Sequence, residues 1–459
     1  YIQIPRIRQP IPIFVLFRAL GVISDQEICK MVLLDLNKET SRKLLFSLKA
    51  SVVESNTCET QEDALVYMTS YAMYTPINMT KEEGAKKKRE FTVSILENDL
   101  FPHCQTKVQK IYFLGYMLNK LLLTSNGLRK VDDRDSYQNK RIDLAGVLLN
   151  NLFRNYFNKL VKDMQKQTIR EINTGSWRSS ENYKNIINHT NIYKIIKSTT
   201  IENGIKRALA TGDFGIKNTN SNKVGVAQVL NRLTYISSLS HLRRVNTPID
   251  KSGKLIPPRK LHNTQWGYIC PAESPEGGSV GVVKNLSYMA HVTIETNTRP
   301  IYDILKNKID HLGENMSEVI SEDLFGKVKV IVNGCWIGTT NNPFELYAYL
   351  KDKKYKAIIN IYTSIVFDIK NKEIVICNDA GRLTRPVFKV KNNELLLTKD
   401  IMRMVEKKQV KWDDLLVNHK FEDSIIEYID SVEQNSSLIS INQKRLVDAK
   451  ESMINKSST

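Results

Sequence analysis

The hydrophobic pattern in the first part of the chain predicts long amphipathic helices. Between Lys107 and Ser125, apolar residues recur at the spacing of one helix face, and Asn126-Gly127 supplies a stop. A second run of the same kind begins after Asp143 and continues to Val161. We interpret both stripes as core-facing, because a helix in a folded domain buries such a stripe against its neighbours. Between them, 131–141 is a polar connector with charges of both signs.

Later in the chain the apolar pattern changes to the alternation typical of strands. Val328–Val332 and Cys335–Ile337 flank Asn333-Gly334, a pair that tolerates the positive φ angles of a tight hairpin turn. Asn342-Pro343 is expected to open a helix. Two further hairpins are predicted, with strands at 364–369, 373–377, 386–390 and 395–397. Together these patterns predict an α+β, multidomain fold, mostly helical at first and with small β-rich domains later.

Composition and cysteine spacing exclude several classes of protein. With 459 residues, 41% of them hydrophobic and 25% charged, the chain is globular and long enough for about three domains. Its longest apolar run, Ile11–Phe17, is far shorter than the roughly 20 residues of a membrane-spanning helix. None of the six cysteines forms a CxxC pair, which argues against a zinc ribbon and favours a reducing, intracellular compartment. Because the chain begins at Tyr1, we expect it to be a piece of a longer protein.

Positive charge is concentrated in the middle of the chain. A formal net charge of +18 favours a polyanionic partner. The stretch from Lys206 to Lys260 holds eleven lysines and arginines against Asp213 and Asp250, so it carries half of the excess. A lysine-rich solvated surface would show a similar excess, and charge alone does not separate these two interpretations.

Two polar loops and an Arg-Arg pair account for much of this local excess. The first loop, Lys217–Lys223, has a lysine at each end and no bulky apolar residue between them. The second, Asp250–Lys260, is stiffened by Pro257-Pro258, and Arg243-Arg244 stands between the two loops. Lysines and the planar fork of arginine suit phosphate groups, which they hold in position without reading base sequence. We therefore predict contacts with the phosphate backbone of a nucleic acid from Lys217, Lys223, Arg243, Arg244, Lys251, Lys254, Arg259 and Lys260.

Residues 261–287 form a turn-rich stretch that contains two carboxylates, Glu273 and Glu276. Such a pair can act as general acid and base or bind a metal, but in a turn of this composition it more often caps a helix or pairs with an arginine. Gly277–Gly281 lacks the spacing of a P-loop and of a dinucleotide-binding glycine motif. A structural role is therefore the favoured interpretation of Glu273 and Glu276.

Several motifs, in order along the chain, resemble one protein family. Three of these motifs are Ser240–Ile249, Leu261–Gly267 and Cys270–Gly277. They resemble the fork region of the second-largest subunit of multisubunit DNA-directed RNA polymerases. Three more motifs resemble the same family. Ile11–Asp25 resembles the start of the family's lobe, and Asp379–Pro386 resembles the beginning of its second external domain. Asp133–Gly146 resembles a further motif of the family. The style is that of the eukaryotic, archaeal and large DNA-virus enzymes, and the richness in Lys, Asn and Ile points to a viral or AT-rich source.

The resemblance implies an order of domains and a channel. It assigns 1–143 to the lobe, 144–203 to the second half of the protrusion, 204–290 to the fork, 291–378 and 379–440 to two external domains, and 441–459 to the start of the connection to a hybrid-binding domain. The two basic loops would be fork loops that face the RNA–DNA hybrid and the downstream edge of the melted DNA. The residues implied to line this channel are Lys217, Lys223, Gln228, Arg243, Arg244, Lys251, Lys254, Arg259, Lys260 and Glu273.

The function that the resemblance implies is template-directed RNA synthesis inside an assembly. The partners would be the largest and the smaller polymerase subunits, the DNA template, the RNA–DNA hybrid and nucleoside triphosphates, with no membrane. The reaction would be nucleotidyl transfer with Mg²⁺ held mainly by the largest subunit. The resemblance therefore implies no catalytic residue and no metal ligand in this chain, and this segment alone is not expected to be catalytic. The location would be the nucleus or, for a large DNA virus, a cytoplasmic factory or the virion.

A free-standing basic protein that binds single-stranded nucleic acid is the alternative from another class. Such proteins stack bases on exposed aromatic side chains along a basic groove. The middle of the chain offers Phe214, Tyr235, Trp266 and Tyr268, mostly in apolar contexts that are more typical of a core. A soluble metabolic enzyme is disfavoured, because the sequence shows no nucleophile–base pair and no metal signature.

Overall fold

The computed structural model describes residues 1–75, 80–174, 192–215, 223–249, 253, 255–311 and 324–448. The chain divides into two compact units: Tyr1–Arg134, Glu295–Asp379 and Pro386–Thr459 make the first, and Asp135–Ile294 and Ala380–Arg385 make the second. Helices and several small sheets are mixed throughout, which confirms the α+β prediction. The domain boundaries implied by the resemblance stay predictions.

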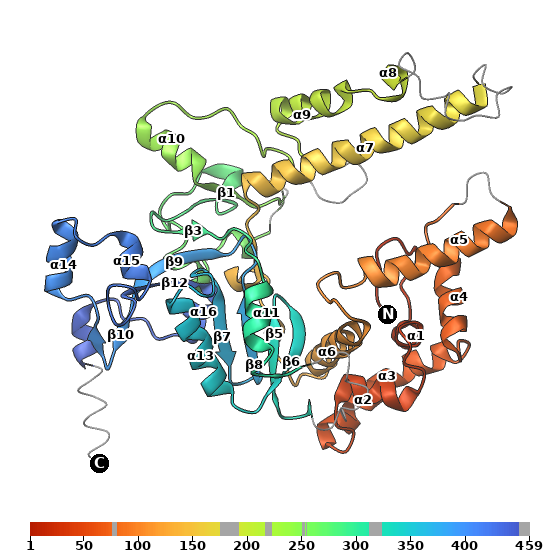
Figure 1. The fold of residues 1–459 in the computed structure, drawn as a ribbon, viewed down its shortest axis with the longest axis horizontal. Helices are drawn as coiled ribbons and strands as arrows, with labels where there is room; N and C mark the ends of the chain where they lie inside the picture. Colours follow the sequence, from red (N-terminus) through yellow and green to blue (C-terminus); the bar gives the residue numbers. More distant parts are fainter. Residues whose placement is uncertain are drawn as a thin grey trace. The chain divides into compact units, whose positions relative to one another are not determined.

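The first unit begins with a helical core (Figure 1, red to orange). Its helices are α1 (Ile13–Ala19), α2 (Asp25–Leu33), α3 (Glu39–Ser55), α4 (Gln61–Tyr71), α5 (Lys81–Ser94), the π-helical turn η1 (Ile95–Asp99) and α6 (Lys107–Ser125). Helix α6 confirms the predicted helix at both ends, and Thr106 caps it by accepting a hydrogen bond from the Gln109 N–H at 3.2 Å. Gly115 lets α6 approach α2 closely, because a Cβ there would lie 2.4 Å from the Met31 carbonyl oxygen.

A five-stranded sheet follows α11 (Arg299–Leu305) in the first unit. Its strands are β4 (Asp310–His311), β5 (Val328–Val332), β6 (Cys335–Thr340), β7 (Ser364–Asp368) and β8 (Glu373–Cys377), in the order β4-β6-β5-β8-β7. Only the β5–β8 pair is parallel. The β5–β6 hairpin is confirmed, and its turn residues Asn333 and Gly334 have φ angles of 48° and 82°. The β7–β8 hairpin is confirmed as well.

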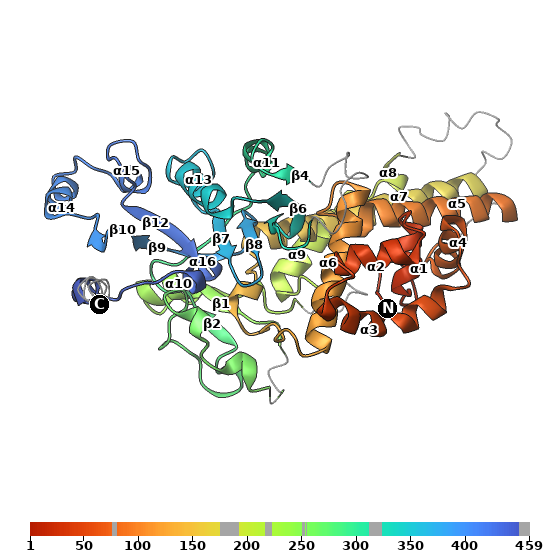
Figure 2. The ribbon, with the colours of Figure 1, turned by 90° about the horizontal axis from the view of Figure 1, so that it is seen from below.

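Helices cover both faces of this sheet. Alternate residues of β5 take opposite sides, so Val330 joins the core with Leu350 of α13 (Pro343–Tyr355), whereas Ile331 joins Tyr112 of α6. Figure 2 shows α11 and α13 on one side of the strands. Asn342-Pro343 opens α13 as predicted.

The rest of the first unit is made of short elements. They are β10 (Val390–Lys391), β11 (Glu394–Leu395), α14 (Lys399–Glu406), α15 (Trp412–Leu416), β12 (Ile426–Asp430) and α16 (Ser431–Ser436). The predicted turn at Asn392-Asn393 is present with positive φ angles at both residues, but the paired arms have only two residues each. Pro386–Phe388 belong instead to β9 (Leu383–Phe388), whose first residues pair with β3 (His291–Val292) in the second unit.

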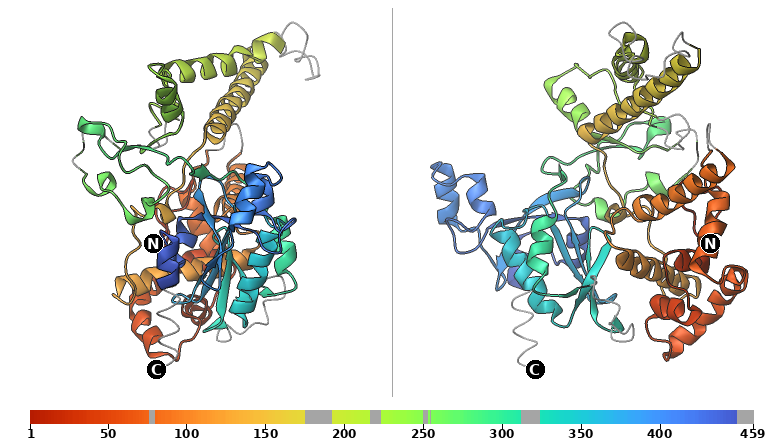
Figure 3. Two further views of the ribbon diagram at one scale, coloured as in Figure 1. Left: turned by 90° about the vertical axis from the view of Figure 1, so that its left-hand side faces the viewer. Right: turned by 45° about the vertical axis from the view of Figure 1, so that its right-hand side comes forward.

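The second unit opens with a helical arm. Helix α7 (Ala145–Thr174) contains the predicted amphipathic run, and after α8 (Ile192–Ile195) the chain returns beside it in α9 (Thr199–Thr211), as Figure 3 shows. Gly212 ends α9 with a φ of 69°, a conformation that glycine adopts readily. The remaining elements are η2 (Tyr137–Asn139), α10 (Tyr235–Leu242), β1 (Arg244–Asn246), η5 (Pro257–Arg259), η6 (Asn263–Gln265), η7 (Gly277–Ser279) and β2 (Val283–Asn285).

The polar connector at 131–141 holds a residue of the second unit's core. Tyr137 is buried beside Tyr268 and Ile269, and burial raises the pKa of Tyr137 to about 12. The Tyr137 N–H donates to the Thr264 hydroxyl at 2.8 Å. The prediction of a merely polar connector missed this anchor, because one aromatic residue among charged neighbours leaves no periodic signal.

Candidate nucleic-acid interface

The Arg-Arg pair lies where α10 ends and β1 begins. Thr234 caps α10 through a reciprocal pair of hydrogen bonds with Ser237. Strand β1 then pairs antiparallel with β2, so that Arg244 lies opposite Asn285. This pairing holds Arg244 next to Asn285, although the two residues are about forty positions apart in the sequence.

Arg243 is engaged by the backbone of its own unit. One guanidinium nitrogen donates to the carbonyl oxygens of Ser287, Tyr288 and Ala290 at 2.7, 3.2 and 3.0 Å. Burial and the nearby Arg243 lower the pKa of His291. The carbonyls are neutral, so the arginine keeps its full charge while it fixes the segment that follows β2.

Arg244 and Glu273 meet at a small polar cluster on the surface. The exposed Arg244 donates from Nε to the Asn285 side-chain oxygen at 3.3 Å. Ser240 donates to the Glu273 carboxylate at 2.5 Å, and the Asn285 amide donates to the Glu273 carbonyl oxygen at 3.3 Å. The structure therefore brings these two predicted residues together through Ser240 and Asn285, both of which lie within stretches singled out from the sequence but were not predicted as site residues.

Arg259 fastens the second basic loop to the glycine-rich segment. Its guanidinium donates to the carbonyl oxygens of Gly278 at 2.6 Å, Val280 at 3.0 Å and Gly253 at 3.2 Å. Gly281 has a φ of 67°, and a Cβ there would lie 2.2 Å from the Arg259 carbonyl oxygen. The glycine run thus serves close backbone packing. The neighbouring Lys260 is exposed.

Of the other predicted residues, the structure describes two and leaves three undescribed. Lys223 forms an ion pair with Asp143 at 3.0 Å, and the exposed Gln228 contacts His241 at 3.0 Å. Lys217, Lys251 and Lys254 lie outside the described residues.

Of the four aromatic residues singled out from the sequence, two are buried and two are exposed. Phe214 and Tyr268 are buried, as the sequence context predicted. Tyr235 and Trp266 are 87% and 67% exposed, so for them the prediction of a core-like context was wrong. Tyr235 is the first residue of α10, and Trp266 follows the turn η6.

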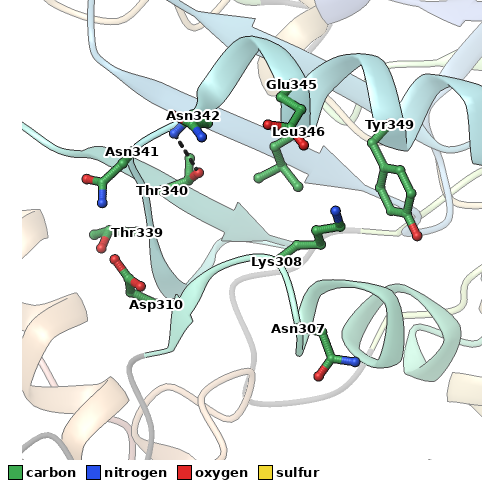
Figure 4. Close-up of a pocket in the computed structure, with 10 residues that line it drawn as sticks. All are labelled: Asn307, Lys308, Asp310, Thr339, Thr340, Asn341, Asn342, Glu345, Leu346 and Tyr349. Carbon is green, nitrogen blue, oxygen red and sulfur yellow. Dashed lines mark hydrogen bonds between the residues drawn. The ribbon is translucent and has the colours of Figure 1, made fainter.

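A separate polar pocket of about 260 Å³ lies in the first unit at the amino end of α13 (Figure 4). The Asn342 N–H donates to the Thr340 hydroxyl at 3.2 Å, and Asp310 on the wall pairs with Lys327 at 3.4 Å. The pocket is lined by Lys308 and by two carboxylates, Asp310 and Glu345, and by none of the predicted site residues. Its charge is unsuited to a nucleic-acid backbone.

Two further findings concern metals and membranes. Within the described ranges, no three His, Cys, Asp or Glu side chains come together in a way that could hold a metal ion. Among the helices of those same ranges, none combines the length and the apolar character needed to cross a bilayer.

Comparisons with known proteins place these features in a family. Models described as RNA polymerase Rpb2 domains 2, 3 and 4 match residues 1–143, 228–292 and 330–391. The chain is 38% identical over 97% of its length to DNA-directed RNA polymerase II subunit RPB2 of Encephalitozoon cuniculi. The chain belongs to the family of second-largest RNA polymerase subunits.

Other relatives show the breadth of this family. DNA-directed RNA polymerase subunit 2 of Acanthamoeba polyphaga mimivirus is 34% identical over 99% of the chain, and DNA-directed RNA polymerase III subunit RPC2 of Drosophila melanogaster is 30% identical over 98%. The chain spans 37 to 38% of the length of these three relatives. The match to second-largest subunits confirms the resemblance drawn from the motifs.

Proposed function

We propose that this chain is part of a DNA-directed RNA polymerase, in which it forms the lobe, fork and external walls of the channel for template-directed RNA synthesis. The observation that carries the proposal is the alignment of nearly the whole chain with named polymerase subunits of both cellular and viral origin. Its partners would be the largest and the smaller subunits of that enzyme. The expected location is the nucleus or, for a viral enzyme, a cytoplasmic factory or the virion.

Within this assembly, the basic segment would contact the DNA template and the RNA–DNA hybrid. The exposed Arg244 and Lys260 would bind phosphates, with Lys223, Gln228 and Glu273 on the same channel wall, and the predicted loop lysines 217, 251 and 254 would extend it. Arg243 and Arg259 would act as positioning residues, because their guanidinium groups already hold backbone carbonyls. Phosphate contacts of this kind position a duplex without selecting a sequence.

The reaction of the assembled enzyme would be nucleotidyl transfer, in which the RNA 3′-hydroxyl attacks a nucleoside triphosphate and pyrophosphate leaves. The Mg²⁺ implied for that reaction does not fit the described residues, which bring no metal-ligating set together. The proposed role of this chain is therefore to bind and orient nucleic acid.

The proposal is tested in the assembled polymerase with paired substitutions. Arg244→Ala with Lys260→Ala should slow elongation and lower the salt dependence of template binding by about one unit of slope per phosphate contact removed. Lys399→Ala with Lys407→Ala removes the same charge from exposed positions of the first unit and serves as the control. Normal elongation by a correctly assembled Arg244/Lys260 variant would contradict the assignment.

The exposed rings of Tyr235 and Trp266 favour one second candidate, a free-standing protein that binds single strands by stacking. It predicts tight binding of single-stranded DNA by the isolated chain, with a loss of about 1–3 kcal/mol when Trp266 is replaced by Ala. The polymerase proposal predicts instead that the chain is recovered with the larger subunit. Recovery of the chain without that subunit would favour the second candidate.

A further inference from the structure

A pocket of about 280 Å³ in the first unit combines an apolar floor with a basic rim. The pocket is lined by residues of α2, α6 and the sheet. Figure 1 shows α6 beside β6, against which it packs. Trp336 of β6 is almost fully buried at its floor beside Tyr116 of α6, and Phe325 is 42% exposed at its edge. We call this feature the basic-rimmed pocket.

The charges around the basic-rimmed pocket are strongly unbalanced. Among the residues that the structure describes, the cationic lining residues are Lys120, Arg129, Lys327, Lys329, Lys370 and Lys372, and the acidic lining residue is Glu373. That carboxylate already accepts hydrogen bonds from the Tyr116 hydroxyl at 2.8 Å and from Lys120 at 3.3 Å. Arg129 and Lys327 have aspartate partners outside the lining. Within the described ranges, Lys329, Lys370 and Lys372 have no carboxylate at ion-pair distance.

Lys329 places a basic side chain between two aromatic rings of this pocket. Its ammonium lies 5.8 Å from the ring centre of Tyr116 and 5.7 Å from that of Trp336. Burial lowers the pKa of Lys329, and the neighbouring Lys120 and Lys372 lower it further against the opposing effect of Glu373. An anionic group that entered here would meet this cation where water screens it poorly.

We propose that the basic-rimmed pocket binds an acidic segment of a partner protein, with one apolar side chain of that segment on the pocket floor and its Asp or Glu residues against the lysine rim. The charge complementarity and the apolar floor argue for such a segment. A nucleotide base could not stack on Trp336, which is only 1% exposed. The inference does not rest on the proposed polymerase function, since its test uses the chain by itself.

The test measures binding of a fluorescent acidic peptide with one central phenylalanine to the full chain by anisotropy. Lys370→Glu with Lys372→Glu should weaken binding by about tenfold or more, because two rim charges are reversed. Both lysines are exposed, so the fold should be retained, and thermal unfolding checks this. The control, Lys399→Glu with Lys407→Glu, makes the same charge change at exposed positions around α14 and should leave binding within about twofold.

Two more variants separate the pocket from general electrostatic attraction. Lys329→Met keeps a similar length and removes the ammonium, so it should weaken binding of the acidic peptide. A peptide with serine in place of phenylalanine should bind more weakly to the parent chain. Equal weakening by the rim and control variants, equal binding of the phenylalanine and serine peptides, or full displacement by a nucleoside triphosphate would each overturn the proposal.

Discussion

Each unit of this molecule contains a cluster of cations, and the two clusters use their charge differently. In the first unit, Lys351 lies 2.7 Å from both Glu427 and Glu433, and Lys354 lies 3.2 Å from the same two carboxylates. All four side chains are at least seven-eighths buried, and their charges cancel. They tie α13 to β12 and α16.

In the second unit, two arginines donate to neutral groups. Arg243 and Arg259 donate to backbone carbonyl oxygens, and these hydrogen bonds do not cancel a charge. Arg244 and Lys260 of this unit are exposed. The partner of a cation therefore decides whether its charge stabilises the fold or is available to a polyanion. The position of the cation in a basic stretch matters less.

The largest effect should come from breaking the buried cluster. Glu433→Ala leaves Lys351 and Lys354 with a single carboxylate and also removes the acceptor of the Ile365 N–H. We expect the free energy of unfolding of the first unit to fall by about 3–5 kcal/mol, because a buried charge loses its partner. Denaturant unfolding measures the loss. Glu90→Ala, which breaks an exposed ion pair with Lys87, is the control and should show little change.

Acid should weaken the same cluster in a defined window. Burial alone would raise the pKa of Glu427, but Lys354 and Lys351 outweigh it and lower that pKa to about 2. A carboxyl whose pKa is depressed on folding contributes stability that is complete above its ordinary value of 4.5 and is lost as the pH falls through the folded value. The first unit should therefore lose stability between about pH 4.5 and 2. Glu427→Gln should flatten this part of the unfolding profile, and an unchanged profile would contradict the assignment.

A smaller effect should separate the two adjacent arginines of the second unit. Arg243→Ala leaves the carbonyls of Ser287, Tyr288 and Ala290 without their donor, which should cost on the order of 1–3 kcal/mol. Arg244→Ala should change stability by less than about 0.5 kcal/mol, because its side chain is on the surface. Amide hydrogen exchange of 286–291 measures the difference. If the amides of 286–291 exchange equally in both variants, Arg243 does not position this segment and the difference between the two arginines is contradicted.

Much of the fold was predictable because it is encoded locally. The ends of α6 follow from apolar spacing and a capping threonine, and the β5–β6 turn follows from the positive φ angles that Asn333 and Gly334 accept. The third hairpin was predicted too long, because the sequence does not show that Pro386–Phe388 would continue β9. The parallel pairing of β5 with β8 was not predictable from either strand alone.

The candidate interface was predictable as a segment but not residue by residue. The motifs at 240–249 and 261–277 located it, and the charge excess agreed. They did not show that Arg243 reaches Ser287, 44 positions away, or that Ser240 and Asn285 would join Arg244 to Glu273. Exposed Tyr235 and Trp266 were mistaken for core residues, because an apolar neighbourhood in sequence does not fix which side chains a surface leaves open.

By itself the sequence determined the type of most elements, the family resemblance and the place where positive charge accumulates. These depend on composition and on residues a few positions apart, since helix faces, strand alternation and turns are local properties. Contacts between distant segments determine which basic side chains are paired, as Lys351 is with Glu427 at 76 positions' distance, and which lie against aromatic rings, as Lys329 does beside Trp336. The physical reason is that burial and pairing arise from contacts between distant segments, and these contacts exist only once the chain has folded.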